Sequence, residues 1–187
     1  MAKLVYSMFV SLDGFIETPD RGLDWHVIDE ELHRFSNEQL RHTRALLYGR
    51  RMYELMAAYW PSADEDPSSP DYVVEYSRLW KDTPKVVFSK TLERVDWNSR
   101  LIRDDAAGEI ARLKAEPGRD LAIGGPNLAS TAIRLGLVDE FQPFIHPVAI
   151  GAGTPFLLDL EEPLRLYLLE TRRFGSGVTY LRYERAG

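Results

Sequence analysis

The sequence contains no cysteine, and this absence removes several kinds of chemistry at once. Without a thiol the chain cannot form a disulfide, use a cysteine nucleophile or bind a metal through thiolate ligands. The histidines give no substitute, because His33, His42 and His146 show no metal-ligand spacing with one another or with acids. We therefore predict no metal site.

Long apolar runs and an excess of positive charge are also missing. No apolar run approaches the ~20 residues that a membrane span requires. The stretch MAKLVYSMFVSLDGF has one lysine and no small-residue cleavage pattern, so it does not resemble a signal peptide. The formal net charge of −6 argues against a nucleic-acid binder held by phosphate neutralisation. We expect a cytoplasmic protein without a membrane or nucleic-acid partner.

Two catalytic motifs are absent as well. Ser7, Ser11 and Ser130 lack the Gly-x-Ser-x-Gly elbow, which argues against a hydrolase. A GxxxxGK[ST] loop would favour a kinase, and the chain does not contain one.

What is present has the composition of an ordinary globular protein. The chain has 187 residues, of which 44% are hydrophobic and 28% charged. This length allows a sizeable core, and no linker or repeat interrupts it, so we predict a single domain over residues 1–187.

Strand-like and helix-like segments alternate through the first three quarters of the chain. The predicted strands cover 4–12, 45–49, 85–89, 101–104 and 121–125. The first predicted helix begins at 29, and the others cover 50–59, 72–82, 106–116 and 127–136. The remainder is β-like, with a hairpin turn at 175–177. This pattern predicts an α/β fold with a mixed central sheet flanked by helices, mostly parallel and finished by an antiparallel hairpin.

Three of the predicted strands end in groups that suit a phosphate. Two of these ends open helices, at Gly49-Arg50-Arg51 and at Gly125-Pro126-Asn127, and the third carries Ser89-Lys90. The carboxyl ends of parallel strands meet at one edge of a sheet, where free helix N–H groups and cations favour anions. The simpler alternatives are a tight turn at the glycines and a solvated face at the arginines. Together the three ends indicate a phosphorylated cofactor, and the several cations favour NADPH over NADH.

Six segments follow one another along the chain: SMFVSLDGFIE (7–17), LLYGRRMYE (46–54), VVFSK (86–90), IGGPNLAS (123–130), GLVDEF (136–141) and HPVAIGAGTPFL (146–157). In this order they resemble the dihydrofolate reductase-like superfamily, and most of all its branch related to the C-terminal reductase domain of the bacterial riboflavin-biosynthesis deaminase-reductase. The resemblance spans nearly the whole chain. The most specific parts are the GR-x-x-YE box, the double-glycine loop and the segment PVAIGAGTPF. The resemblance implies a three-layer α/β/α reductase fold that binds NADPH and is commonly a homodimer.

The resemblance also implies where the cofactor binds. The segment around Gly14 would line the nicotinamide ring, the box after Gly49 would hold the cofactor phosphates, and Ser89 would lie beside the adenosine 2′-phosphate. The double-glycine loop would hold the pyrophosphate. The implied cofactor contacts are Met8, Gly14, Phe15, Ile16, Gly49, Arg50, Arg51, Met52, Ser89, Lys90, Gly124, Gly125, Pro126, Asn127 and Leu128.

The substrate side matches the family only in part, because the riboflavin-type domain recognises a ribose phosphate and this sequence has no separate phosphate motif for that role. Dihydrofolate reductases place a carboxylate on the first helix and an aromatic residue one turn later. Glu31 and Phe35 have that spacing, so the resemblance implies Glu31 as the catalytic acid and Phe35 as a substrate contact. The alternative is that Glu31 and its acidic neighbours are solvated acids at a helix start. Trp25 and Tyr53 are further candidates for substrate contact, although Tyr53 equally suits the core. His26 is either a proton donor or an exposed loop residue.

The sequence thus predicts an NADPH-dependent reductase of a small heterocyclic or sugar-derived substrate. It resembles 5-amino-6-(5-phosphoribosylamino)uracil reductase or dihydrofolate reductase. The alternative is a nucleotide-binding sensor on the same fold that has lost catalysis.

Overall fold

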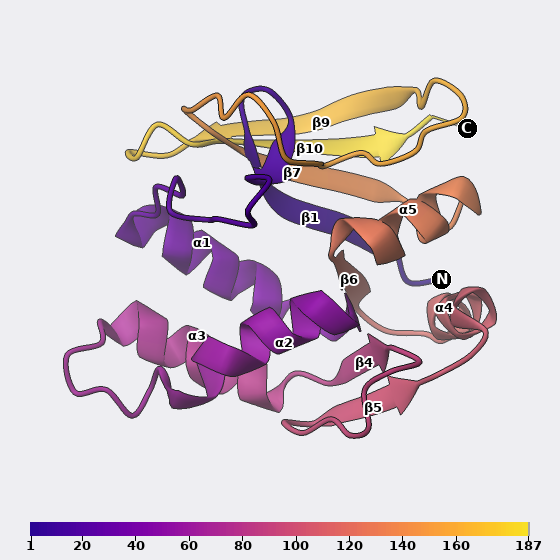
Figure 1. The fold of residues 1–187 in the computed structure, drawn as a ribbon, viewed down its shortest axis with the longest axis horizontal. Coiled ribbons are helices and arrows are strands. Elements are labelled where there is room, and N and C mark those ends of the chain that lie inside the picture. The colour runs from indigo at the N-terminus through magenta and orange to yellow at the C-terminus, as the bar shows by residue number, and fades with distance from the viewer. Residues whose placement is uncertain (187) are drawn as a thin grey trace.

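A computed structural model of the chain describes residues 1–186 (Figure 1). The elements are β1 (Leu4–Ser11), β2 (Phe15–Glu17), α1 (Glu30–Arg41), β3 (Thr43–Gly49), α2 (Arg50–Tyr59), a 3-10 turn (Trp60–Ser62), α3 (Asp71–Asp82), β4 (Lys85–Phe88), β5 (Ser99–Ile102), α4 (Ala106–Ala115), β6 (Asp120–Gly124), α5 (Pro126–Arg134), β7 (Glu140–His146), β8 (Thr154–Pro155), β9 (Leu166–Arg173) and β10 (Thr179–Arg185).

Within these residues the main sheet has eight strands in the order β5-β4-β3-β6-β1-β7-β10-β9. The pairs from β5 to β7 are all parallel, while β10 runs antiparallel to both β7 and β9. The hairpin β9–β10 therefore forms one end of the sheet and β5 the other, as Figure 1 shows. The mixed sheet with an antiparallel finish is confirmed.

Alternating side chains of the strands are buried on both faces of the sheet. Leu4 and Tyr6 of β1 belong to a cluster that includes Ile110 of α4 and Ile133 of α5. On the other face, α1, α2 and α3 contribute Leu40, Tyr53 and Trp80 to a second cluster. Since helices cover both faces, the fold has three layers, as predicted.

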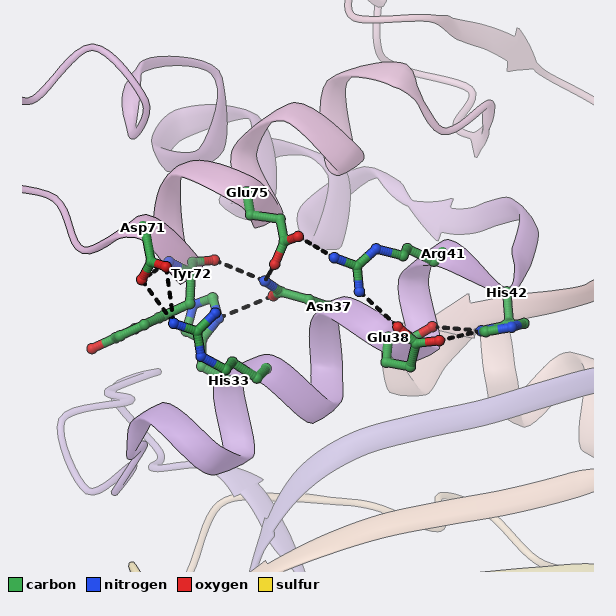
Figure 2. Close-up of polar contacts among 9 residues, drawn as sticks. His33, Asn37, Glu38, Arg41, His42, Asp71, Tyr72 and Glu75 are labelled. Carbon is green, nitrogen blue, oxygen red and sulfur yellow. Dashed lines mark hydrogen bonds and ion pairs between the residues drawn. The ribbon is translucent and has the colours of Figure 1, made fainter.

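The position of α1 is fixed at its start and along its length. The Asp29 carboxylate caps the helix by accepting a hydrogen bond of 2.8 Å from the Leu32 N–H. Figure 2 shows the polar contacts between α1 and α3, in which the buried Asn37 amide donates to the Tyr72 carbonyl (2.9 Å) and to the Glu75 carboxylate (2.6 Å). Arg41 also pairs with Glu75. These contacts hold the helix that carries Glu31 and Phe35 in one orientation.

Two features lie outside what the sequence predicted. The short sheet β2–β8 was not predicted, because two-residue β8 gives no periodic signal of its own. His26, which the sequence left open as a proton donor or an exposed loop residue, is half-buried.

Within the described range 1–186, none of the helices combines the length and the apolar character that a membrane span needs.

Candidate cofactor-binding site

The predicted site residues converge because their strands are parallel neighbours in register. Tyr48 pairs with Gly124, and Gly49 pairs with Phe88 directly before Ser89. The ends of β3, β4 and β6 therefore lie side by side at the carboxyl edge of the sheet. This is the edge at which ligands bind in open α/β sheets.

The starts of α2 and α5 pack against each other at this edge. Gly49 and Gly125 are their N-caps, and within the described residues no side chain caps either helix. A Cβ on Gly49 would lie 3.8 Å from Leu128 Cβ, and one on Gly125 would lie 3.4 Å from Met52 Cβ. Two helix N-termini with free N–H groups thus meet at one corner, where both helix dipoles favour an anion.

Glycine is favoured at the two positions of the loop for different structural reasons. Gly124 is buried, and a Cβ there would lie 3.1 Å from Tyr48 Cε1 and 3.2 Å from Met52 Cε. Gly125 has a φ of 94°, which favours glycine over any residue with a Cβ. The tight turn that the sequence analysis left open as an alternative is therefore present. It places the backbone of Gly125, which has no side chain, at the corner where α2 and α5 begin.

Arg50 lies beside the loop that follows β4. Its Nη1 donates to Thr91 Oγ1 (2.9 Å) and its Nε to Glu54 (2.9 Å). Ser89 Oγ accepts hydrogen bonds from the backbone N–H groups of Thr91 and Leu92, at 3.2 and 3.0 Å. Lys90 is exposed, with its Nζ 3.7 Å from Asp104. The Ser89 hydroxyl and the cations Arg50 and Lys90 therefore lie on the same side of this edge.

Arg51 faces a different neighbour. Both of its terminal nitrogens donate to the carboxylate of Glu17, which also accepts a 2.6 Å hydrogen bond from Thr154 Oγ1. Burial disfavours the charged form of Glu17, but the hydrogen bonds from Arg51 and Thr154 outweigh it and lower the pKa of Glu17. Glu17 ends β2, so Gly14, Phe15 and Ile16 lie just before this contact. Met8 packs against the cluster below α5.

On the substrate side, Glu31 and Phe35 share one partner. The Glu31 carboxylate accepts from Arg172 Nη2 at 2.9 Å and from the Gly175 N–H at 3.3 Å. The Arg172 guanidinium lies 4.9 Å from the centre of the Phe35 ring. The Glu31 side chain is 50% exposed. The first helix is thus tied to the β9–β10 hairpin through the predicted catalytic acid.

Tyr53 lies in the core beneath α2 and is 6% exposed. Its hydroxyl is bonded to the backbone of Asp96. This position favours the packing role that the sequence left open for Tyr53.

A group of aromatic rings escaped the sequence prediction. Trp25 and His26 pack against His146, which is fully buried at the end of β7, with ring centroids 5.5 and 5.2 Å from it. Phe9 of β1 contacts both imidazoles. Burial lowers the pKa of His26 and of His146 to about 4, so both rings are neutral near pH 7. No local pattern could have found this group, because β7 is distant in sequence.

The Val27 N–H donates to Nδ1 of His146 at 3.0 Å. Since Nδ1 is an acceptor, the ring proton of neutral His146 is on Nε2. The Nε2 atoms of His26 and His146 and Nε1 of Trp25 have no partner among residues 1–186.

Two cavities of the structure lie away from the predicted cofactor residues. Two open cavities of about 620 and 670 Å³ lie at the opposite, amino-terminal edge of the sheet, next to Lys3 and Arg44, and neither is lined by a predicted site residue. In the part of the chain that the structure describes, no three His, Asp or Glu side chains gather as a metal ion requires.

Comparison with known proteins identifies the family. The family model of the RibD C-terminal domain matches residues 2–180. The chain belongs to the RibD C-terminal domain family. The chain is also similar to the uncharacterised protein YyaP of Bacillus subtilis (strain 168), with 35% identity over 182 residues, which is 97% of this chain and 94% of YyaP.

Solved structures show that the RibD-family chain has the dihydrofolate reductase-like fold. A putative riboflavin biosynthesis protein from Shewanella sp. PV-4 matches with a TM-score of 0.74 at 22% identity, covering 100% of both chains. Dihydrofolate reductase from Enterococcus faecalis, solved with NADP(H), matches with a TM-score of 0.67 at 14% identity over 99% of this chain and 97% of its own. The family resemblance and the fold class predicted from the sequence are confirmed.

Proposed function

We propose that this protein is an NADPH-dependent reductase of a small heterocyclic or sugar-derived substrate. Membership of a reductase-like family supports reduction in general. The single observation that supports a dinucleotide is the corner where the uncapped starts of α2 and α5 meet, with Gly125 free of a side chain. Arginines and a lysine flank this corner, and phosphates are the anions that such groups bind best.

Different residues along this edge would hold different parts of NADPH. The backbone N–H groups of Gly125, Asn127 and Leu128 and those at the start of α2 would bind the pyrophosphate, together with Arg51. Arg50, Ser89 and Lys90 would bind the 2′-phosphate. Met8 and the segment Gly14–Ile16 remain for the nicotinamide side.

Bound NADPH supplies a hydride to the acceptor. The protein's contribution is to orient the two reactants and to exclude water, which accounts for much of the rate in such reactions. Glu31 and Phe35 of α1 are proposed substrate contacts. Trp25, which precedes this helix, is a third. The proton comes from water or from an acid such as Glu31.

A nucleotide-binding sensor is the second candidate, and one observation favours it. The Glu31 carboxylate is already engaged by Arg172 and by the Gly175 backbone. Both oxygens of this carboxylate accept hydrogen bonds from the protein itself, which leaves fewer lone pairs for a substrate.

Calorimetric titration with NADPH and NADH tests the cofactor. NADPH oxidation in the presence of dihydrofolate or 5-amino-6-(5-phosphoribosylamino)uracil then separates reductase from sensor. Tight NADPH binding with turnover of either compound supports the reductase. Tight binding without turnover of these or related heterocycles supports the sensor, and absence of dinucleotide binding contradicts both.

A further inference from the structure

The Glu17–Arg51 pair differs from the other ion pairs around the cofactor corner. The Glu17 side chain is only 8% exposed, whereas that of Arg51 is 47% exposed. The neighbouring pair Arg50–Glu54 is open to water on both sides, at 52% and 46%. Water screens the Arg50–Glu54 pair, but it hardly reaches the Glu17 carboxylate. Glu17 therefore has a strong electrostatic interaction with any charged group near Arg51.

Glu17 is held in place by the short sheet β2–β8. Glu17 pairs with Thr154 in this sheet, and the Phe156 N–H donates to the Gly14 carbonyl at 2.9 Å. Gly153 packs so closely on the Glu17 backbone that a Cβ there would lie 1.8 Å from the Glu17 oxygen. The carboxylate is therefore presented to Arg51 by a fixed segment rather than by a free side chain.

The two arginines serve different parts of the edge. Arg50 is bonded to Thr91 in the loop of Ser89 and Lys90, while Arg51 points to the β2–β8 sheet on the other side of the start of α2. Arg51 lies next to Met52, which packs on Gly125 of the α5 start. Arg51 is thus a neighbour of the proposed pyrophosphate site and not of the proposed 2′-phosphate site.

We propose that Glu17 is an affinity-setting residue that competes with the pyrophosphate group of a dinucleotide for Arg51. A guanidinium binds a carboxylate and a phosphate through the same pairs of N–H groups, so the two acceptors exclude each other at the Arg51 terminal nitrogens. Binding therefore costs the Glu17–Arg51 contact, and the remaining carboxylate repels the phosphate. This inference rests on the proposed function, because it takes a dinucleotide as the ligand.

The test is the substitution Glu17→Gln, which keeps one acceptor oxygen for Arg51 and offers an N–H group to the Thr154 hydroxyl oxygen, but removes the charge. We expect its affinity for NADPH and for NADH to rise by the same factor, of about tenfold, in calorimetric titration. Glu54→Gln is the matched control at the exposed pair and should change both affinities by less than about twofold. Unchanged or weaker binding by Glu17→Gln, or a gain confined to NADPH, overturns the proposal.

Two further variants show whether the effect acts through Arg51. Arg51→Gln removes the contested partner, so adding Glu17→Gln to it should give no gain; a gain that persists overturns the proposal. Glu17→Asp withdraws the carboxylate by one methylene and should give a smaller gain in the same direction. It decides the question if Glu17→Gln does not fold.

Inorganic pyrophosphate distinguishes this inference from the proposed function. If the native protein and Glu17→Gln bind neither dinucleotide, the proposed function fails, and the inference is then judged on pyrophosphate alone. Tighter pyrophosphate binding by Glu17→Gln than by the native protein supports the competition. Equal binding, or none by either protein, overturns it.

Discussion

At the scale of single residues, Gly125 combines a backbone requirement with a place at the proposed phosphate corner. Its φ of 94° is unfavourable for any residue with a Cβ, and it starts α5 without a side-chain cap. Stability and ligand affinity are therefore both sensitive to this position, and a substitution must be compared with one that has only the backbone effect.

The substitution Gly125→Ala is expected to lower NADPH affinity by at least about tenfold while the protein still folds. The added methyl group strains the turn by roughly 1 kcal/mol and stands between the backbone N–H groups and the phosphate. Gly136→Ala is the control, because Gly136 has a φ of 68° at the far end of α5. Thermal melting should show a loss in both variants, and calorimetry a loss of affinity in Gly125→Ala alone. Undiminished NADPH binding by folded Gly125→Ala would contradict the site.

Arg50 is the residue that we expect to set the preference for NADPH over NADH. Removing one charged contact to a phosphate costs about 1.5–3 kcal/mol, so Arg50→Gln should reduce the ratio of the two affinities by about tenfold or more. NADH affinity should change much less. Arg78→Gln, which removes an exposed arginine of α3, is the control. A ratio that Arg50→Gln leaves unaltered would place the 2′-phosphate elsewhere.

At the scale of elements, the sequence predicts what local patterns encode. Three elements follow from residues within a few positions of one another: the strand ending at Gly49, the helix over 50–59 and the helix that begins near Asp29. The β2–β8 sheet and its Glu17–Arg51 contact join segments that are distant in sequence, and only the folded chain brings them together. The residues of the proposed cofactor site come from such local signals, because they lie in turns and at helix starts.

The segment that carries Trp25–Val27 is attached to β7 by contacts that require neutral histidines. The Val27 N–H donates to His146 Nδ1, and this bond is lost when Nδ1 is protonated. Burial lowers the pKa of His26 and His146 from 6.5 to about 4, so the unfolded chain binds more protons between these values. Their contribution to stability is complete above about pH 6.5 and is lost as the pH falls towards about 4.

We therefore expect the free energy of unfolding to fall between about pH 7 and about pH 5, by about 1–3 kcal/mol from these two groups. Urea denaturation at both pH values measures it. His146→Gln keeps an acceptor for the Val27 N–H but does not titrate, so its stability should depend less on pH. Other titrating groups, such as the half-buried His33, are common to both proteins and cancel in the difference. An equal pH dependence in the two proteins would show that His146 is not protonated on unfolding.

At the scale of the whole molecule, the proposed cofactor corner and an exposed apolar edge strand lie at different places on the sheet. The proposed cofactor corner lies at the carboxyl ends of β3, β4 and β6, whereas the exposed apolar residues of β9 lie at the end of the sheet (Figure 1). Tyr167, Leu168 and Leu169 of this edge strand are 62%, 54% and 41% exposed. Successive residues of a strand point to opposite faces, so apolar side chains are exposed on both faces of β9.

An exposed, apolar edge strand is a surface that proteins normally cover, and a second copy of the chain is the partner that we propose. Light scattering at micromolar concentration should give twice the chain mass of 21.4 kDa. Leu168→Lys places a charge on the edge and should shift the mass towards that of one chain. Leu135→Lys is the control, because Leu135 is 53% exposed at the end of α5 and is not part of the edge strand β9. A native protein with the mass of one chain would refute the homodimer, and a dimer that Leu168→Lys leaves intact would place its interface on another surface.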